Sequence, residues 1–510
     1  MSDVVNVIRN FDFKRIIGLY IAPALFIFIV FFVELEPANP SVSYTLAVAI
    51  LMALWWITEV IPIAITSLLP VVLFPLLGVM DGKEVSSAYF NHVIFLFIGG
   101  FIVALAMQKW DLHKRIALKI LSFTGTSPSK ILLGFMLASA FLSMWISNTA
   151  TAMMMVPILL SIIVKLEDIL EPEDLRKYSI GLLLGVAYGS SIGGIATLVG
   201  TPPNLSFVRI MQIMFPEAPE VSFSSWFVFA MPLSIIFFII IWLFLKHRFK
   251  PKVSKGIMTG VAFKEQYKKL GKASFEERSI LSVFIALIVL WLTRNGLDLG
   301  NFSIPGWGDL FSQPNYINDG TVAISLAIIL FLIPSREKKG KMIMNWKTTS
   351  RLPWNIVLLF GGGFALASGF KESGLSIWFG EELSSIESLH PILIVLIISF
   401  VVTFLTEFTS NTATIEILLP VLAGLALTIG VNPLLLMLPA TISASMAFML
   451  PVATPPNAII FGTNKIRILD MARTGLILNL IGILLVTLLT YFWAPLVFDY
   501  DPTILPPWAH

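Results

Sequence analysis

Predominantly apolar windows recur along this chain from residue 16 to residue 498, with clear examples at 16–35, 92–108, 224–245, 391–408 and 472–495. A helix needs about 17 to 25 such residues to span a hydrocarbon core of roughly 30 Å. With 57% hydrophobic and only 13% charged residues, the chain is also far from the balance of a soluble domain. We therefore predict an all-α integral membrane protein. The first window lacks a small-residue cleavage site and is followed at once by further spans, so we expect a retained helix rather than a signal peptide.

The positions of the basic residues predict the topology. Of the 34 Lys and Arg residues, 30 lie in the N-terminus and in segments 109–130, 165–177, 246–278, 336–351 and 465–473. Because basic loops stay in the cytoplasm, the chain is expected to start inside, to end outside and to cross an odd number of times. About eleven transmembrane helices satisfy this condition, near 16–35, 43–60, 61–80, 92–108, 178–208, 224–246, 279–294, 320–335, 353–370, 433–464 and 472–498.

Two apolar stretches are left over, 131–164 and 389–430, and each has the same kind of loop on both flanks. A segment that enters and leaves on one side is a re-entrant hairpin. The charge pattern places the first hairpin on the cytoplasmic side and the second on the outside. Each hairpin carries one copy of Ser-Asn-Thr-Ala-Thr, at 147–151 and at 410–414.

The sequence contains an internal repeat. The segments LFIGGF and LFGGGF, the two Ser-Asn-Thr motifs, and Pro157 and Pro420 are all related by an offset of 263 residues. Farther along, GTPPN at 200–204 matches ATPPN at 453–457 with an offset of 253. Since the two hairpins open from opposite sides, the repeats have inverted topology. We divide the chain into an N-terminal peripheral helix (1–40), a first repeat (41–246), a basic cytoplasmic linker (247–278) and a second repeat (279–510).

The repeated motifs predict interrupted helices. Ser, Asn and Thr favour helix N-caps, and Pro removes an amide donor. Unwound backbone at membrane depth survives only where protein buries it or water lines it. An interrupted helix offers amides that attract anions and carbonyls that bind cations. Four such elements meeting at a pseudo-twofold axis predict a cation-coupled carrier of small anions.

These motifs also carry a family resemblance. The two Ser-Asn-Thr hairpins, the two (G/A)-T-P-P-N motifs and the stretch MLPVATPPNAIIFGTNKIRILDM resemble the divalent anion/sodium symporter family, over nearly the whole chain beyond the first helix. The resemblance implies a scaffold domain that forms a homodimer and a transport domain that moves as an elevator. It also implies a dicarboxylate or citrate substrate and electrogenic transport with more than two sodium ions for each dianion.

The resemblance further implies the positions of the binding sites. Sodium would bind at two sites, one made by Ser143, Ser147, Asn148 and Gly200 and the other by Thr406, Thr409, Asn411 and Ala453. The substrate carboxylates would be held by Asn148, Thr149, Thr201, Asn411, Thr412, Thr454 and Pro455. No Lys or Arg is among these residues, so bound sodium must offset much of the charge of the dianion.

The choice of substrate follows from one residue. Citrate-preferring relatives tend to lose the Thr of the second motif, so Thr412 favours succinate, malate or fumarate. A sodium-independent dicarboxylate exchanger and a citrate-preferring carrier of the same family stay as alternatives. Lineages that handle sulfate have similar architecture, but the two intact hairpin motifs favour carboxylates. We expect an integral plasma membrane protein, with a bacterial inner membrane favoured over a eukaryotic plasma membrane. Its expected partners are lipid, sodium, substrate and a second copy of the chain.

Other functional classes have little support in the sequence. An intramembrane enzyme is disfavoured because the five His residues are scattered, the chain has no Cys, and neither a G-x-S-x-G elbow nor a P-loop is present. A passive channel would show one continuous polar lining rather than paired broken helices. We expect no cofactor and no nucleic-acid partner. Glu407 and Glu416 correspond to Met144 and Met153 in the first repeat, which favours structural roles over proton transfer.

Overall fold

The computed structural model describes residues 15–252, 261–298 and 303–509. Helices make up nearly all of the regular structure in this part of the chain. The exception is one antiparallel pair of two-residue strands, β1 (Leu297–Asp298) and β2 (Ser303–Ile304). Apart from this short hairpin, the predicted all-α class is confirmed.

The first six helices of the described chain lie before the segments that have a counterpart in the other repeat. They are η1 (Ile17–Ile21), α2 (Ala22–Phe32), α3 (Ser41–Thr58), α4 (Ile63–Thr66), α5 (Leu69–Leu77) and α6 (Gly82–Ser87). The single helix predicted near 61–80 is thus two helices, separated at Ser67 and Leu68. Both α4 and α5 pack against α3 and α18.

The first repeat contains seven consecutive helices. They are α7 (His92–Lys109), α8 (Leu112–Thr124), α9 (Pro128–Ser143), α10 (Asn148–Glu167), α11 (Pro172–Ile195), α12 (Pro202–Met214) and α13 (Phe223–Arg248). The elements that follow are α14 (Val261–Lys269), α15 (Phe275–Leu292), η2 (Trp307–Leu310), η3 (Pro314–Tyr316), α16 (Asp319–Leu332) and α17 (Trp346–Thr349).

The second repeat has the same order of long helices and breaks. Its elements are α18 (Trp354–Ser373), α19 (Leu375–Glu382), η4 (Ser384–Ser388), α20 (Pro391–Thr406), α21 (Asn411–Thr428), α22 (Pro433–Ala444), α23 (Pro455–Phe461) and α24 (Ile468–Phe492). The chain ends with α25 (Ala494–Phe498) and η5 (Pro507–Ala509). By sequence offset, α9–α13 correspond to α20–α24.

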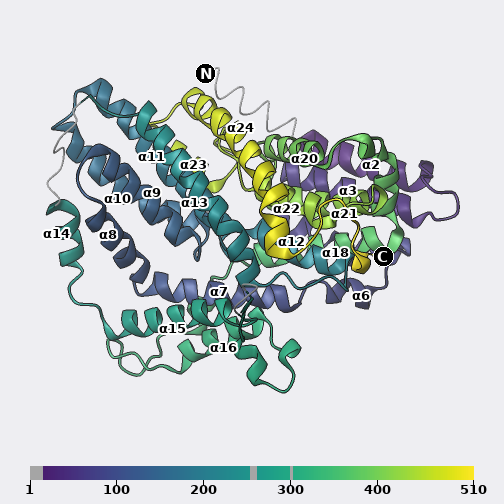
Figure 1. The fold of residues 1–510 in the computed structure, drawn as a ribbon, viewed down its shortest axis with the longest axis horizontal. Helices are drawn as coiled ribbons and strands as arrows, with labels where there is room; N and C mark the ends of the chain where they lie inside the picture. Colours follow the sequence, from purple (N-terminus) through teal and green to yellow (C-terminus); the bar gives the residue numbers. More distant parts are fainter. Residues whose placement is uncertain (1–14, 253–260, 299–302, 510) are drawn as a thin grey trace.

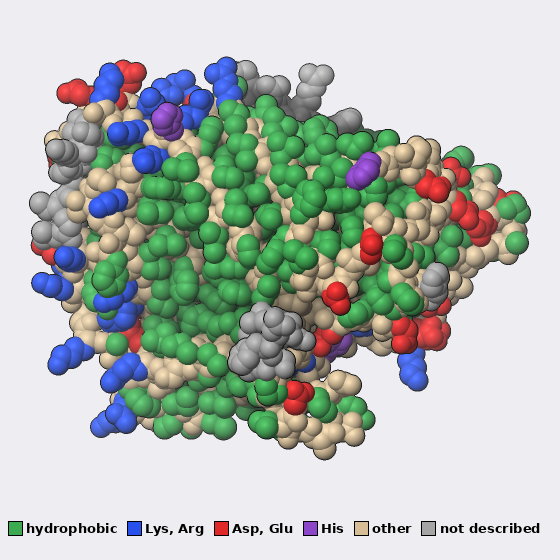
Figure 2. All heavy atoms as spheres, viewed as in Figure 1, with side chains coloured by type: hydrophobic (Ala, Val, Ile, Leu, Met, Phe, Trp, Pro, Cys, Tyr) green, Lys and Arg blue, Asp and Glu red, His purple; other side chains and the backbone are tan. Residues whose placement is uncertain are grey.

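The apolar helices agree with a membrane protein. Among the described residues, seven helices are long and apolar enough to cross a membrane, and six shorter apolar helical segments accompany them. Figure 2 shows hydrophobic side chains over the middle of the visible face, with Lys and Arg gathered along its left edge and Asp and Glu toward its right edge. Helices lie at every predicted crossing, with breaks inside those at 61–80, 178–208 and 433–464, while the number of crossings stays a prediction.

The two repeats interlock through their broken helices. Within each repeat, the first helix of the predicted hairpin packs on the helix that precedes the (G/A)-T-P-P-N motif, α9 on α11 and α20 on α22. Between repeats, α10 contacts α23 and α12 contacts α21. Figure 1 shows the result, in which α12 lies among the second-repeat helices beside α18, and α23 lies among the first-repeat helices beside α11. Each half therefore inserts a short helix into the other.

Glycines allow close packing around this interlocked centre. A Cβ atom at Gly99 on α7 would lie 2.6 Å from the carbonyl carbon of Ala323 on α16. On α18, a Cβ atom at Gly363 would collide with the buried carboxyl group of Glu416 on α21. Both glycines belong to the repeated Gly-rich segments, so these segments permit close packing of helices.

Candidate functional site

Each of the four repeated motifs lies at a helix break. The chain leaves helical structure between α9 and α10, between α11 and α12, between α20 and α21, and between α22 and α23. The helix after each break begins directly after a hydroxyl residue of a motif, which serves as its N-cap: Ser147, Thr201, Ser410 and Thr454. The predicted interruptions of the helices are thus confirmed, and the N-termini of four helices lie at candidate site residues.

The first break gathers three of the four residues predicted for the first sodium site. The Ser143 hydroxyl donates a hydrogen bond to the Asn148 side-chain oxygen. A Cβ atom at Gly194 would lie 2.6 Å from that oxygen and 3.1 Å from the Gly200 carbonyl oxygen, so Asn148 and Gly200 both border Gly194. The Ser147 hydroxyl instead accepts a hydrogen bond from the Ala150 amide at 3.3 Å, as a helix cap does.

The second break repeats this geometry. The Thr406 hydroxyl lies 2.7 Å from the Asn411 side-chain oxygen and 2.9 Å from the Ala444 carbonyl oxygen. The pairs Ser143–Asn148 and Thr406–Asn411 are related by the offset of 263 residues. The Thr409 hydroxyl is bonded to Thr414 and to the Leu405 carbonyl, which leaves the main-chain carbonyl of Thr409 as its candidate ligand atom.

Hydroxyl and amide oxygens dominate the candidate cation sites. Oxygen donors without charge suit a hard cation such as sodium, which binds through hydroxyl, amide and carbonyl oxygens. Within the described residues, no group of three or more His, Asp and Glu side chains is placed to hold a metal ion. The donor set therefore fits an alkali cation better than a transition metal.

Three candidate substrate residues have free hydroxyl groups. Thr149 and Thr412 are the second residues of α10 and α21, and Thr201 is the N-cap of α12. Their hydroxyls form no hydrogen bond within the part of the chain that the structure describes. Thr201 and Thr412 are 3% and 7% exposed. Hydroxyls that form no hydrogen bond within the described structure are available to bind a ligand. Thr454 differs, because its hydroxyl accepts a hydrogen bond from the Asn457 amide at 3.4 Å.

The two halves of the candidate site make no direct hydrogen bond to each other. Among the described residues, no hydrogen bond links a predicted ligand residue of the first repeat to one of the second repeat. The halves are held together by helix packing, α10 on α23 and α12 on α21, and by the Tyr188 hydroxyl, which donates to the Phe448 carbonyl oxygen at 2.8 Å. Ala453 and Pro455 lie at the start of α23, which places them on the element that α10 contacts.

Two positioning residues were not recognised from the sequence. The Asn204 side-chain amide donates to the carbonyl oxygens of Gly194 at 3.3 Å and of Thr197 at 2.8 Å. The Asn457 amide donates to the carbonyl oxygens of Ala447 and Leu450, both at 3.0 Å. The offset of 253 relates Asn204 to Asn457, Gly194 to Ala447 and Thr197 to Leu450.

Asn204 and Asn457 therefore hold the unwound carbonyls in the same way in both halves. Both side chains are fully buried, and the oxygen of each amide has no partner in the described structure. Each residue is the last letter of a (G/A)-T-P-P-N motif. The signal for their role was thus present in the paired motifs, although the carbonyls that they bind could not be read from spacing.

Glu407, in the predicted hairpin of the second repeat, binds the break between α22 and α23 in a way that has no equivalent in the first repeat. Its carboxylate accepts hydrogen bonds from the amides of Phe448 at 2.7 Å, Met449 at 2.8 Å and Leu450 at 3.0 Å, and from the Asn479 side chain at 2.8 Å. These contacts fit the structural role favoured from the sequence.

The equivalent link in the first half uses neutral groups. The Thr197 hydroxyl donates to the Met144 carbonyl oxygen at 2.5 Å. Trp226, which is related to Asn479 by the offset of 253, donates its indole N–H to the Ile195 carbonyl oxygen at 3.1 Å. The breaks between α11 and α12 and between α22 and α23 are thus each linked to the predicted hairpin of their repeat and to the long helix that follows. A carboxylate makes this link in the second repeat, and neutral donors make it in the first.

A duplicated set of broken helices inside an apolar bundle is the architecture of a secondary membrane transporter. The family described as "Sodium:sulfate symporter transmembrane region" matches residues 14–498 of this chain. The chain belongs to this family of divalent anion/sodium symporters. It is a membrane transporter with sodium as its coupling ion, and not an enzyme.

Curated relatives are similar over nearly the full length. The sodium-dependent dicarboxylate transporter SdcS of Staphylococcus saprophyticus is 42% identical over 501 residues, which cover 97% of this chain and 94% of the relative. The protein of the same name from Staphylococcus aureus is 44% identical with the same coverage.

Two solved transporters share the fold at low sequence identity. The Alcanivorax borkumensis YdaH transporter has a TM-score of 0.55 at 13% identity and covers 82% of this chain and 86% of its own. Neisseria gonorrhoeae MtrF, from a class of antimetabolite efflux pumps, has a TM-score of 0.54 at 13% identity, with 81% and 82% covered. At this level of identity the similarity concerns the fold alone.

Proposed function

We propose that this chain is a sodium-coupled symporter of C4-dicarboxylates such as succinate, malate and fumarate. The observation that carries the proposal is the equivalence of the pairs Ser143–Asn148 and Thr406–Asn411, each at a helix break and each at the N-terminus of the helix that follows. The relatives named sodium-dependent dicarboxylate transporters support the substrate class.

In the proposed site, oxygen atoms bind sodium and helix N-terminal amides bind the substrate carboxylates. Hydroxyl, amide and main-chain oxygens at each break bind one sodium ion, at Ser143, Ser147, Asn148 and Gly200 in one half and at Thr406, Thr409, Asn411 and Ala453 in the other. The substrate carboxylates lie at the N-termini of α10, α12, α21 and α23, where amides carry partial positive charge. Asn148 and Asn411 contribute to both cation and substrate binding, which couples the two.

The absence of a basic side chain among these candidate residues makes sodium part of the site. Two carboxylates that leave water need compensating charge, because an unpaired buried charge costs several kcal/mol. Within the described residues, the ion pairs recorded involve none of the candidate ligands. Binding of the dianion is therefore expected to be weak until the cation sites are filled.

We propose the membrane arrangement on the basis of charge. The N-terminus lies in the cytoplasm and the C-terminus outside, in a bacterial inner membrane, with about eleven crossings, two re-entrant hairpins and inverted repeats. Lys and Arg gathered at one edge of the molecule support this orientation (Figure 2). The division at 1–40, 41–246, 247–278 and 279–510, an elevator motion and a homodimer belong to the same proposal.

Uptake of radiolabelled succinate into proteoliposomes tests the function. An inward sodium gradient should drive accumulation above the external concentration, and replacement of sodium by potassium should abolish it. Counterflow of succinate without sodium would instead identify an exchanger, and stronger competition by citrate than by malate would identify a citrate carrier. Absence of any saturable flux would refute the proposal.

A further inference from the structure

A cavity of about 350 Å³ lies away from the helix breaks, between the start of α11 and the loop that joins α23 to α24. The residues of interest in its lining are Arg176, Ser179, Asn464, Lys465 and Arg467. Ser179 precedes the end of α11 at Ile195 by 16 residues, about 24 Å of helix. The cavity is thus distinct from the candidate transport site.

The loop of this cavity exists in only one of the two repeats. In the first repeat, α12 continues as a helix through residues 209–214. In the second repeat, α23 ends at Phe461, and the equivalent residues 462–467 form a turn in which Asn464 has a φ of +59°. This turn belongs to the Gly-Thr-Asn-Lys-Ile-Arg part of the sequence motif, to which the proposed transport mechanism gives no role.

Positive charge converges on the cavity. Arg176 comes from α11, and Lys465 and Arg467 come from the turn. Their ionic contacts are long and partly exposed, 3.8 Å from Arg176 to Asp470 and 3.9 Å from Lys465 to Glu167. Arg467 has no salt bridge within the described residues. Such charges are only weakly neutralised by the protein.

Two long helices also begin at the cavity, α11 at Pro172 and α24 at Ile468. Neither N-cap residue, Glu171 or Arg467, forms a side-chain capping hydrogen bond. The first turns contain the acidic residues Glu173 and Asp174 on α11 and Asp470 on α24, and the Asp174 carboxylate accepts a hydrogen bond from the Lys252 amide at 2.9 Å. Amides at the start of a helix favour an anion.

Ser179 gives an independent indication of a ligand. The residue is only 3% exposed, it lines the cavity, and its hydroxyl forms no hydrogen bond within the described part of the chain. A helical Ser commonly bonds to the carbonyl four residues earlier. An unpaired buried hydroxyl that faces a cavity is available to donate to an acceptor inside it.

We propose that this cavity binds an oxyanion, a phosphate or a carboxylate group, through Arg176, Ser179, Lys465 and Arg467. With the orientation proposed above, the cavity lies on the cytoplasmic side at the level of the lipid headgroups. The oxyanion comes from the phosphodiester of an anionic phospholipid or from a free anion in the cytoplasm. Because α11 and the turn belong to different repeats, a bound oxyanion links the two halves and stabilises their contact.

Thermal unfolding of the purified full chain in detergent tests the proposal. The buffer contains potassium salts without sodium, so that the proposed transport site is not filled, and ionic strength is kept constant with potassium chloride. The probes are potassium phosphate, potassium succinate, and micelles that contain phosphatidylglycerol or, for comparison, phosphatidylcholine. We expect saturable stabilisation by at least one anionic probe and none by phosphatidylcholine. A response to phosphatidylglycerol alone identifies a lipid site, and a response to phosphate or succinate identifies a soluble anion.

Three variants assign the effect to the cavity. Arg467→Gln and Ser179→Ala should each weaken the apparent affinity roughly tenfold, the loss expected for one hydrogen bond to a charged group. Ser179→Ala should leave the unfolding temperature without probe unchanged, because its hydroxyl bonds to no protein group. Arg351→Gln, at an exposed arginine in another basic loop, should respond as the wild type. Equal responses of wild type, Arg467→Gln and Ser179→Ala, or no response of the wild type to any anionic probe, would overturn the proposal.

Discussion

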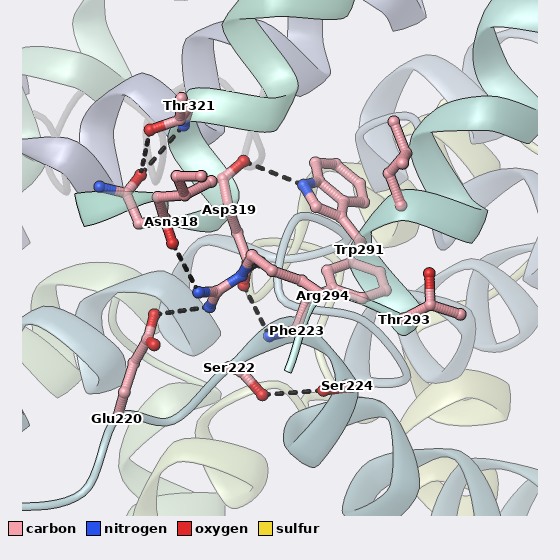
Figure 3. Close-up of polar contacts among 12 residues, drawn as sticks. Glu220, Ser222, Phe223, Ser224, Trp291, Thr293, Arg294, Asn318, Asp319 and Thr321 are labelled. Atoms are coloured by element: carbon pink, nitrogen blue, oxygen red, sulfur yellow. Dashed lines mark hydrogen bonds and ion pairs between the residues drawn. The ribbon is translucent and has the colours of Figure 1, made fainter. Parts of the chain in front are cut away.

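The Arg294 guanidinium and the Asp319 carboxylate form a buried ion pair, with 2.6 Å between Nε and Oδ1 and 5% of each side chain exposed. Figure 3 shows how this pair gathers three segments. A second guanidinium nitrogen of Arg294 lies 2.8 Å from Glu220, and the other oxygen of Asp319 accepts the Phe223 amide at 2.8 Å. The pair therefore ties the start of α13 to the end of α15 and the start of α16.

Replacement of Arg294 by Gln should destabilise the protein by about 3–5 kcal/mol, because it leaves the Asp319 carboxylate buried without its partner. Unfolding of the detergent-solubilised protein by denaturant measures this loss. The additional change Asp319→Asn should restore part of it, since the double variant buries no charge. Arg278→Gln, on the exposed face of α15, serves as the control and should change stability by less than about 0.5 kcal/mol. A similarly small effect of Arg294→Gln would show that the pair contributes little.

Loss of the Asn204 amide should impair the first half of the transport site, and loss of the Asn457 amide should impair the second half to a similar extent. Asn204→Leu and Asn457→Leu keep the approximate shape of the side chain and add no charge, but they remove the N–H groups that bind carbonyl oxygens in each half. We expect a destabilisation of about 1–3 kcal/mol for each variant, and a loss of sodium affinity that exceeds any loss of expression. Sodium-dependent thermal stabilisation of the purified variants provides the measurement. Unchanged sodium affinity in both variants would limit these residues to a purely structural role.

Much of the fold could be predicted because membrane physics leaves few options. The apolar windows located the helices, and the offsets of 263 and 253 identified equivalent residues before any contact was known. The N-cap positions of Ser147 and Thr454 followed from the chemistry of Ser and Thr at helix starts.

Contacts across the repeats could not be predicted in the same way. No periodicity in the sequence indicates that the Glu407 carboxylate accepts three consecutive backbone amides between α22 and α23. These amides, at residues 448–450, are 41 to 43 residues from Glu407. The buried ion pair of Arg294 was also not predicted, because Arg294 and Asp319 are 25 residues apart in the sequence. Tertiary packing, rather than local pattern, decides both contacts.

Asn148→Ala and Asn411→Ala should each abolish sodium-driven succinate uptake while the protein stays folded. Each side-chain oxygen accepts a hydrogen bond from the hydroxyl five residues earlier, and each residue is proposed to contact both sodium and substrate. Size-exclusion profiles and unfolding temperatures verify the fold, and uptake into proteoliposomes measures the function. Wild-type transport by both variants would refute the assignment of the site.

Thr412→Val should weaken dicarboxylate binding more than sodium binding. Valine keeps the branched shape but removes a hydroxyl that forms no hydrogen bond in the described structure, so little stability should be lost. The loss of one hydrogen bond to a carboxylate corresponds to about 1.5–3 kcal/mol, or at least a tenfold increase in the half-saturating succinate concentration. Thr414→Val is a useful contrast, because the Thr414 hydroxyl already bonds to Thr409 and to the Ser410 carbonyl. Equal losses of succinate and sodium affinity in Thr412→Val would argue against a direct contact with the substrate.

The contribution of Glu276 to stability should be lost at low pH. This residue precedes the predicted crossing at 279–294, and its carboxylate accepts hydrogen bonds from the Ser335 hydroxyl and from the amides of Arg336 and Glu337, at 2.7–2.9 Å. Burial raises the pKa of Glu276, but the backbone and hydroxyl donors outweigh it and bring the pKa from 4.5 down to about 2.

Because the folded-state pKa is lower than the unfolded value, Glu276 stabilises the protein above about pH 4.5, and this stabilisation is lost as the pH falls toward about 2. Glu276→Gln should therefore be less stable than the wild type near neutral pH, by about 1–3 kcal/mol, and the difference should shrink as the medium is acidified. Glu337→Gln is the matched control, since it keeps the amide that Glu276 binds. A stability difference that stays constant between neutral pH and pH 3 would show that the charge of Glu276 does not hold the 335–337 loop.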